Sequence, residues 1–196
     1  MHGIGYSTIR KTTPRGFTLI EIVIVLAILG LLAVIALPNI DLGRYQANSA
    51  MQGIGSTLLA AQRRAVTRQH DIVVTFNIAT NAMSVHEDAN NDGDVDADER
   101  NIAYPVGDKI VFGAGGAPDH PIGPGPITFT KVVRGFPALT FHRNGSASES
   151  GGFYLTTRRA LSAGGIPTDG RVIEVERSTG RTSWFRFVNG QWRRGF

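Results

Sequence analysis

An acidic stretch near the middle of the chain has the spacing of a calcium-binding loop. Residues 88–99 read DANNDGDVDADE and fit the pattern D-x-[DN]-x-[DN]-G-x5-E at every specified position. Calcium takes about six to eight oxygen ligands, which alternate side chains of such a loop supply, and Gly93 permits the sharp turn. The predicted calcium ligands are Asp88, Asn90, Asp92, Asp94, Asp96 and Glu99.

The same stretch has an interpretation without metal. Asp and Asn side chains form Asx turns in solvent, and the flanking segments have the character of strands rather than of the two helices that enclose an EF-hand loop. The sequence leaves a calcium site and a solvated hairpin loop both open. Calcium is the one cofactor that it predicts.

Arginine and aromatic side chains alternate near the C-terminus. The arginines are Arg181, Arg186, Arg193 and Arg194, and the rings are Trp184, Phe185 and Trp192. Arginines bind nucleic-acid phosphates while rings stack on bases, so this stretch is a candidate DNA contact. The alternative is a solvated strand face whose rings belong to the protein core.

Other reactive groups are sparse in this chain of 196 residues. There is no cysteine, and the five histidines do not have metal-ligand spacing. No nucleophile elbow, phosphate-binding loop or catalytic acid pair is recognisable. The formal charge is +4, with three of the bases in the first 16 residues. We therefore predict that the protein is not an enzyme.

An apolar segment near the N-terminus is long enough to cross a bilayer. Residues 17–37 contain a single charge, Glu21, and as a helix they would span about 31 Å, close to the hydrocarbon thickness. Arg10, Lys11 and Arg15 precede it, which orients the N-terminus toward the cytoplasm. A secretory signal peptide has a shorter apolar core of about 7–15 residues. A single-pass membrane anchor is therefore predicted.

A helix pattern and then a series of strand patterns follow the anchor. Six apolar residues recur every three or four positions, which predicts one helix face up to about Arg68; they are Ala47, Met51, Ile54, Leu58, Ala61 and Ala65. Gly53 and Gly55 weaken that helix. Short alternating segments bounded by turn residues then predict strands. These lie at 72–76, 83–86, 102–106, 127–133, 139–142, 152–157, 171–176 and 182–188. The fold class is α+β, a long helix packed on an antiparallel sheet.

The N-terminal residues carry a family resemblance. Arg15-Gly16-Phe17-Thr18-Leu19-Ile20-Glu21, followed by the apolar run and Pro38, resembles the class III signal of type IV pilins and type II secretion pseudopilins. The resemblance implies cleavage between Gly16 and Phe17 by a prepilin peptidase and methylation of the Phe17 amine. It also implies that Glu21 and Pro38 serve filament assembly, with other pseudopilins or pilins as partners.

A second resemblance narrows the subfamily. Ala61-Gln62-Arg63-Arg64-Ala65 and Phe141-His142-Arg143-Asn144-Gly145 are similar to segments of the H-type minor pseudopilins and of FimT- and FimU-like minor pilins, the GspH/FimT family. It implies a minor pseudopilin of the type II secretion system, with a DNA-binding minor pilin of a type IV pilus as the alternative. FimT-like pilins are thought to use a Gly-Arg-x-Arg motif, and residues 180–183, GRTS, lack its second arginine.

The predicted organisation follows from these patterns and resemblances. Residues 1–16 form a prepilin leader, 17–37 a transmembrane and filament-core helix, 38–70 its amphipathic continuation, and 71–196 a periplasmic β-sheet domain. The protein is expected in the inner membrane and, after assembly, in a filament. A more distant alternative is a secreted calcium-binding module with an ordinary signal peptide, which would begin near Pro38 when mature.

Overall fold

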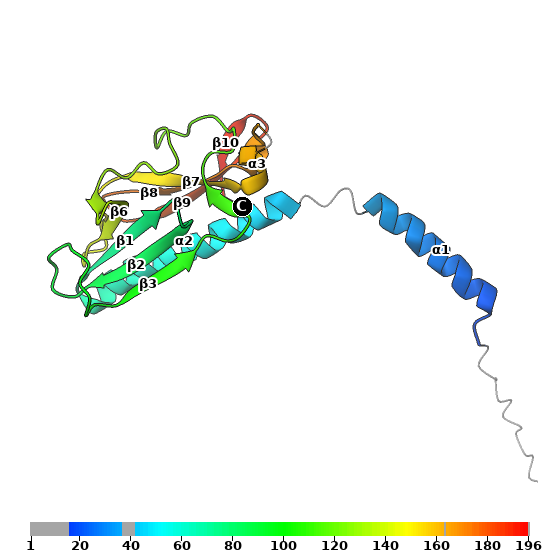
Figure 1. Cartoon of the computed structure of the whole chain (residues 1–196), viewed down its shortest axis with the longest axis horizontal. Coiled ribbons are helices and arrows are strands. Elements are labelled where there is room, and N and C mark those ends of the chain that lie inside the picture. The colour runs from blue at the N-terminus through cyan, green and yellow to red at the C-terminus, as the bar shows by residue number, and fades with distance from the viewer. Residues whose placement is uncertain (1–15, 37–41, 163, 196) are drawn as a thin grey trace, which may run out of the picture. The chain divides into compact units, whose positions relative to one another are not determined.

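A computed structural model describes residues 16–36, 42–162 and 164–195 (Figure 1). The chain divides into two compact units, Met1–Asp41 and Leu42–Phe196. The basic leader and Pro38 lie outside the described residues, so the predictions made for them are not addressed by the structure.

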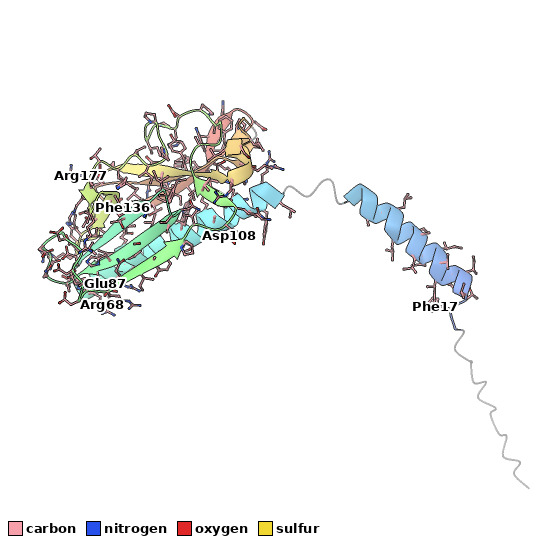
Figure 2. All side chains as sticks on the ribbon, in the orientation of Figure 1. Phe17, Arg68, Glu87, Asp108, Phe136 and Arg177 are labelled. Atoms are coloured by element: carbon pink, nitrogen blue, oxygen red, sulfur yellow. The ribbon has the colours of Figure 1, made fainter. Side chains whose placement is uncertain are left out.

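The first unit contains one helix, α1, Leu19–Ala36. Its sequence is apolar on all sides, and every described side chain from Phe17 to Ala33 is exposed. Figure 2 shows Phe17 at the start of this helix. Within the described ranges, no helix has the combined length and apolarity of a candidate membrane span.

The second unit begins with α2, Leu42–Arg68, whose predicted apolar stripe is confirmed. All six stripe residues are buried, and Gly55 is buried with them. The helix ends at Arg68, and the next residue, Gln69, has a left-handed φ of 60° while its N–H donates to the Ala65 carbonyl at 3.0 Å. The 3.6-residue period of the sequence therefore sets which face of α2 meets the sheets.

Two five-stranded antiparallel sheets follow. The first has the order β3-β2-β1-β6-β5 and the second β10-β9-β8-β7-β4. The strands of the first are β1 Asp71–Asn77, β2 Ala82–Asp88, β3 Asn101–Pro105, β5 Val132–Val133 and β6 Phe136–Phe141. Those of the second are β4 Ile110–Phe112, β7 Gly151–Thr157, β8 Arg171–Val175, β9 Thr182–Val188 and β10 Gln191–Arg194.

The core lies between α2 and strands of both sheets, which α2 contacts along its length (Figure 1). Phe76 is at its centre, with ring centroids 5.0 Å from Phe153, 5.4 Å from Phe129 and 6.2 Å from Phe112. Such close-packed rings bury large apolar areas with specific geometry. The predicted α+β class, a helix packed on antiparallel sheet, is confirmed.

Helix α2 approaches β9 very closely at one glycine. A Cβ atom on Gly55 would lie 2.2 Å from Nε1 of Trp184, whereas one on Gly53 would meet nothing within 4 Å. The sequence alone predicts that both glycines weaken the helix. The structure gives Gly55 a packing role instead, because only a residue without a side chain lets the Trp184 indole lie against the helix backbone.

Some elements differ from the sequence-based prediction. Of the strand expected at 127–133, only β5 forms, because the N–H groups of Thr130 and Lys131 donate to the Glu149 carboxylate at 2.8–3.0 Å instead of joining a ladder. Strand β4 and the short helices α3, Arg158–Ser162, and η2, Pro167–Asp169, carried no sequence signal. All are five residues or fewer, too short for periodicity to reveal them.

Candidate functional site

The N-terminal motif forms a capping box at the start of α1. The Glu21 N–H donates to Thr18 Oγ1 at 3.2 Å, and the Thr18 N–H donates to Glu21 Oε2 at 3.4 Å. These reciprocal bonds satisfy two N–H groups that have no partner inside the helix. The spacing Thr-x-x-Glu was a readable signal of this cap, which the sequence analysis did not use.

Glu21 therefore has a role within a single chain, as part of the N-terminal cap of α1. Its carboxylate lies in the first turn of α1, where the helix dipole favours negative charge. It is also close in sequence to Phe17, whose side chain is 79% exposed.

The acidic loop between β2 and β3 begins at a buried carboxylate. Asp88 is 1% exposed, and its two oxygens accept N–H bonds from Asp92 at 3.1 Å and Gly93 at 2.9 Å. Gly93 has a φ of 84°, as the predicted sharp turn requires. The first half of the loop is thus folded around the Asp88 carboxylate.

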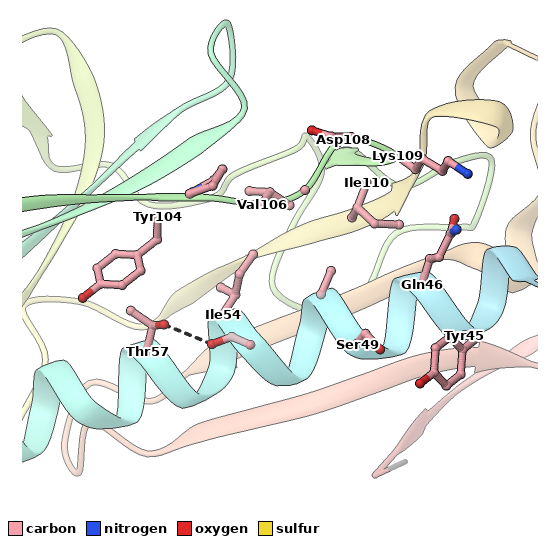
Figure 3. A pocket seen from close by; sticks show the side chains of 14 residues that line it. Tyr45, Gln46, Ser49, Ile54, Thr57, Tyr104, Val106, Asp108, Lys109 and Ile110 are labelled. Atoms are coloured by element: carbon pink, nitrogen blue, oxygen red, sulfur yellow. Dashed lines mark hydrogen bonds between the residues drawn. The ribbon is translucent and has the colours of Figure 1, made fainter.

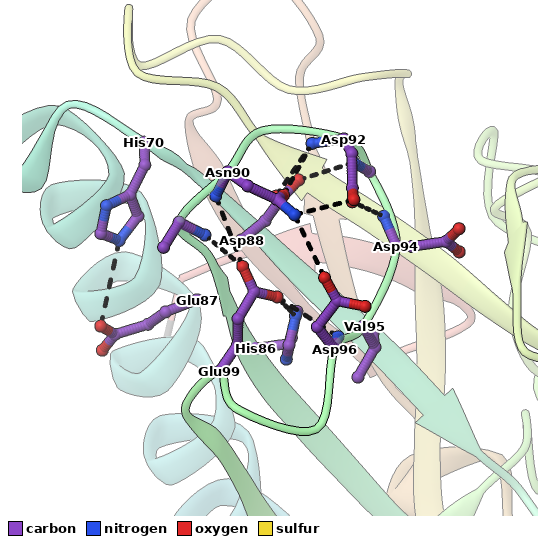
Figure 4. A network of polar contacts seen from close by, with 12 residues as sticks. His70, His86, Glu87, Asp88, Asn90, Asp92, Asp94, Val95, Asp96 and Glu99 are labelled. Atoms are coloured by element: carbon purple, nitrogen blue, oxygen red, sulfur yellow. Dashed lines mark hydrogen bonds and ion pairs between the residues drawn. The ribbon is translucent and has the colours of Figure 1, made fainter.

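The middle of the loop is held by an amide group. Asn90 Nδ2 donates to Asp92 Oδ2 at 2.8 Å and to Asp96 Oδ2 at 3.1 Å (Figure 4). Asn90 Oδ1 in turn accepts the Asp92 N–H at 3.0 Å, which is an Asx turn. The amide nitrogen therefore lies between two of the carboxylates that were predicted to share a cation.

Glu99, the last predicted ligand, faces the inside of the domain. Its Oε2 lies 2.7 Å from Nε2 of His86, a side chain only 1% exposed, and its Oε1 accepts the Ala89 N–H at 2.7 Å (Figure 4). Burial alone would raise the pKa of Glu99, but bonds from the N–H groups of Ala89 and Asp96 and from His86 together lower it below its ordinary value of 4.5. The carboxylate is therefore ionised at neutral pH, and both of its oxygens have hydrogen-bond partners.

The calcium prediction stays a prediction. In the part of the chain that the structure describes, no group of three or more His, Cys, Asp or Glu side chains is arranged to hold a metal ion. The oxygen-rich ligand set has the right chemistry, but Asn90 and Glu99 would have to turn toward a common centre. Val95, in contrast, is already anchored, because it is 6% exposed and clusters with Val73, Val133 and Ala138.

The aromatic rings of the C-terminal stretch are packed within the domain. Trp192 lies 5.4 Å from Phe187 and 5.7 Å from His120, and its Nε1 donates to the Pro118 carbonyl at 2.9 Å. The Phe185 ring packs against His120 with the ring centroids 4.4 Å apart. These rings hold the Gly- and Pro-rich segment 113–126 against the second sheet. They are thus engaged in packing rather than presented for base stacking.

The four candidate DNA-binding arginines do not form one group. Arg186 lies opposite Arg193 in the β9–β10 ladder, whereas Arg194 lies opposite Phe185 and donates to Ser183 Oγ at 2.7 Å. Because alternate residues of a strand point to opposite faces, Arg193 and Arg194 lie on different faces. Arg181 lies before β9, 4.0 Å from Glu176. Only Arg186 and Arg193 share a face as a pair.

The two segments that carried the subfamily resemblance meet in space. Gln62 Nε2, on α2, donates to the Gly145 carbonyl at 2.9 Å and to the Thr179 carbonyl at 2.7 Å. The absence of a side chain at Gly180 permits this close contact. Its φ is 62°, and a Cβ there would lie 2.3 Å from the Gly145 oxygen. Gln62 therefore joins α2 to one turn of each sheet, a role that the sequence analysis missed.

A buried acid connects α2 to the acidic loop. Glu87, the residue before Asp88, is 7% exposed, and its Oε1 lies 2.8 Å from Arg64 Nη1. Arg68, His70 and Arg100 lie 3.9–4.0 Å from the same carboxylate. A buried charge is tolerated when it is paired in this way, so the ion pair fixes β2 against the last turns of α2.

Comparison with known proteins identifies the N-terminal segment. A family model described as the prokaryotic N-terminal methylation motif matches residues 12–37. The chain carries this methylation motif. The match covers the candidate cleavage point, Phe17, Glu21 and the whole of α1, and it fits a membrane-anchored, pilin-like protein. A comparison with curated protein sequences gave no match.

Two solved structures of the minor pseudopilin EpsH, from the type II secretion system of Vibrio cholerae, are similar to the chain. One is 13% identical with a TM-score of 0.46, covering 72% of this chain and 97% of that one. The other is 17% identical with a TM-score of 0.44, covering 72% and 96%. In this chain the methylation motif includes α1 and is followed by α2 and the strands of two antiparallel sheets.

Proposed function

We propose that the protein is a minor pseudopilin, a structural subunit that is made as a membrane-anchored precursor and joins the pseudopilus of a type II secretion system. The observation that carries the proposal is the methylation motif over residues 12–37, which includes the whole of α1, a helix with no buried side chain from Phe17 to Ala33. Such an apolar surface is stable only against lipid or other apolar helices.

The proposal assigns two successive environments to α1. Before assembly, the sequence 17–37 is a single-pass anchor in the inner membrane with the second unit in the periplasm. After cleavage at Gly16 and methylation of Phe17, the same apolar surface packs against the helices of other pseudopilins. The Glu21 carboxylate then pairs with a neighbour's Phe17 amine, since an acid among apolar helices requires a partner.

The rest of the molecule supports a structural rather than a catalytic role. Its buried polar groups, such as Glu87 with Arg64 and Gln62 with two carbonyls, join elements of the fold. The packed rings Trp192 and Phe185 favour the pseudopilin over the alternative of a DNA-binding minor pilin, which would present rings to bases.

Processing is the first test. The full chain is co-expressed with a prepilin peptidase, and the N-terminus of the product is identified by mass spectrometry. We expect a chain that begins with N-methylated Phe17. A mature N-terminus near Pro38 would instead show an ordinary signal peptide and would contradict the proposal.

Matched variants then separate the two roles of Glu21. Thr18→Ala removes the capping hydroxyl but keeps the charge, whereas Glu21→Gln keeps a capping side chain but removes the charge. If the carboxylate pairs with a neighbour's amine, Glu21→Gln and Glu21→Ala are cleaved normally but fail to enter filaments, and Thr18→Ala still enters them. Normal incorporation of Glu21→Gln would contradict the pairing and leave only the cap.

A further inference from the structure

The end of the second unit at which α2 begins carries several bases side by side. Lys109 precedes β4, and Arg158 and Arg159 begin α3. The Arg158 N–H donates to the Lys109 carbonyl at 2.7 Å, next to the Ile110–Thr157 pair of the β4–β7 ladder. With Leu42 and Gln46 of α2, these bases line one cavity of about 250 Å³.

These three bases are exposed to solvent and little neutralised. Among the described residues, no carboxylate forms an ion pair with any of them. Asp108 is the exposed acid beside them. Arg158 Nε donates to the backbone carbonyl of Asp108, at 3.4 Å, and not to its carboxylate. Asp169, the other nearby acid, is fully buried against Thr157. The surface is therefore positively charged.

Exposed apolar side chains surround the same bases. Leu42 is 62% exposed, Tyr45 71% and Leu161 53%. Figure 3 shows Tyr45 and Gln46 on the first turns of α2, with Gln46 directed toward Lys109; Tyr45 and Lys109 both line the pocket drawn there. Basic residues mixed with Tyr and Leu are typical of protein surfaces that lie at the level of lipid headgroups, where the ring and aliphatic chains reach the acyl boundary.

The position of this surface in the chain points to the bilayer. Five residues, 37–41, join the last residue of α1 to Leu42. We propose that the surface formed by Leu42, Tyr45, Lys109, Arg158, Arg159 and Leu161, the α2-start patch, docks on anionic phospholipid headgroups before the subunit enters a filament. This inference rests on the proposed function, in which α1 is embedded in the same bilayer.

The charges set the size of the expected effect. A base near an anionic membrane surface favours the docked state by about fivefold, so the three bases together favour it by roughly a hundredfold. Salt screens the attraction, with a Debye length of about 10 Å at 0.1 M ionic strength. Docking should therefore depend on both anionic lipid and low salt.

The absence of cysteine in the sequence allows a direct test. The full chain with Leu161→Cys carries one environment-sensitive fluorophore and is reconstituted in vesicles of phosphatidylcholine, alone or mixed equally with phosphatidylglycerol. We expect the label to report an apolar environment in the mixed vesicles only, and to lose that signal at high salt. A label at Ala97→Cys, in the acidic loop beyond the other end of α2, should stay in water throughout.

Charge reversal provides the matched control. Lys109→Glu/Arg158→Glu/Arg159→Glu should reduce the docked fraction by at least a hundredfold. Arg63→Glu/Arg143→Glu/Arg177→Glu changes the net charge equally at exposed positions elsewhere and should leave docking unchanged. Figure 2 labels Arg177 at the end of the unit that is far from the start of α2. Equal losses in both triple variants would overturn the assignment of the patch.

A third label separates this inference from the proposed function. Ile28→Cys, in α1, should report the bilayer interior in both vesicle types. If it does while the Leu161 label stays in water, the patch inference fails and the anchor stands. If the Ile28 label itself stays in water, the membrane anchor fails and the inference with it. A Leu161 signal that responds to duplex DNA but not to mixed vesicles would also overturn it.

Discussion

Helices α1 and α2 are both long, but they use their apolar residues in opposite ways. Every described side chain of α1 up to Ala33 is exposed, whereas α2 buries one stripe against two sheets and exposes the opposite side. The difference lies in the period of the sequence, continuous in α1 and striped in α2. A striped helix finds its partner in its own chain, and a uniformly apolar helix requires one from outside.

The largest expected effect tests this difference with the same substitution in both helices. Leu58→Ala, at a fully buried position of α2, should lower the free energy of unfolding of the second unit by about 2–5 kcal/mol. Leu26→Ala, at a 62% exposed position of α1, should change it by less than about 0.5 kcal/mol. Denaturant titration of the full chain in detergent measures both. Similar losses would show that α1 also stabilises the second unit.

A pair of glycines gives the next largest effect. Gly53→Ala should stabilise α2 by up to about 1 kcal/mol, because alanine is the better helix former and the position is open. Gly55→Ala should instead destabilise by about 1–3 kcal/mol, because its methyl group would displace the Trp184 indole. The melting temperatures of the two variants should therefore shift in opposite directions. A stabilised Gly55→Ala protein would contradict the close approach of α2 and β9.

The next prediction concerns calcium, which should stabilise the second unit beyond its α2 core if the acidic loop binds it. If the loop binds with an affinity of about 10⁻⁴ M, 1 mM calcium should add about 1.4 kcal/mol, and the melting temperature should rise by about 3–5 °C. Glu99→Gln should abolish the rise. An unchanged melting temperature in calcium and in chelator would favour the solvated loop, held by Asn90 and His86.

The smallest effect is expected at the edge of the first sheet. Burial alone would raise the pKa of Glu149, but the N–H groups of Lys131 and Thr130, the Thr130 hydroxyl and the Lys131 charge outweigh it and hold the pKa below 4.5. Glu149 therefore contributes stability that is present above about pH 4.5 and lost as the pH falls through its lowered pKa. Glu149→Gln should cost about 1 kcal/mol at neutral pH.

The pH dependence supplies the control for that variant. The free energies of unfolding of Glu149→Gln and of the unchanged chain should converge as the pH is lowered, because protonation neutralises the carboxylate that the substitution removes. A difference that persists at low pH would mean that the introduced amide disturbs the segment by its shape rather than by the missing charge.

Features with a regular period or a defined spacing could be predicted from the sequence. The buried stripe of α2 and the place of the acidic loop follow from residue type and interval alone. The orientation of Glu99 toward His86 could not be predicted, because it depends on where β2 places a side chain 13 residues away. Likewise, the pairing of Arg186 with Arg193 follows only from the strand register.

The Gln62 contact has a consequence for how the second unit folds. One amide nitrogen on α2 binds carbonyl oxygens 83 and 117 residues further along the chain. Contacts between such distant residues close large loops, whose entropy must be overcome before the contacts form. Helix α2 is made early but lacks this contact until the last third of the chain is present. We therefore expect the second unit to become stable only when the chain is complete.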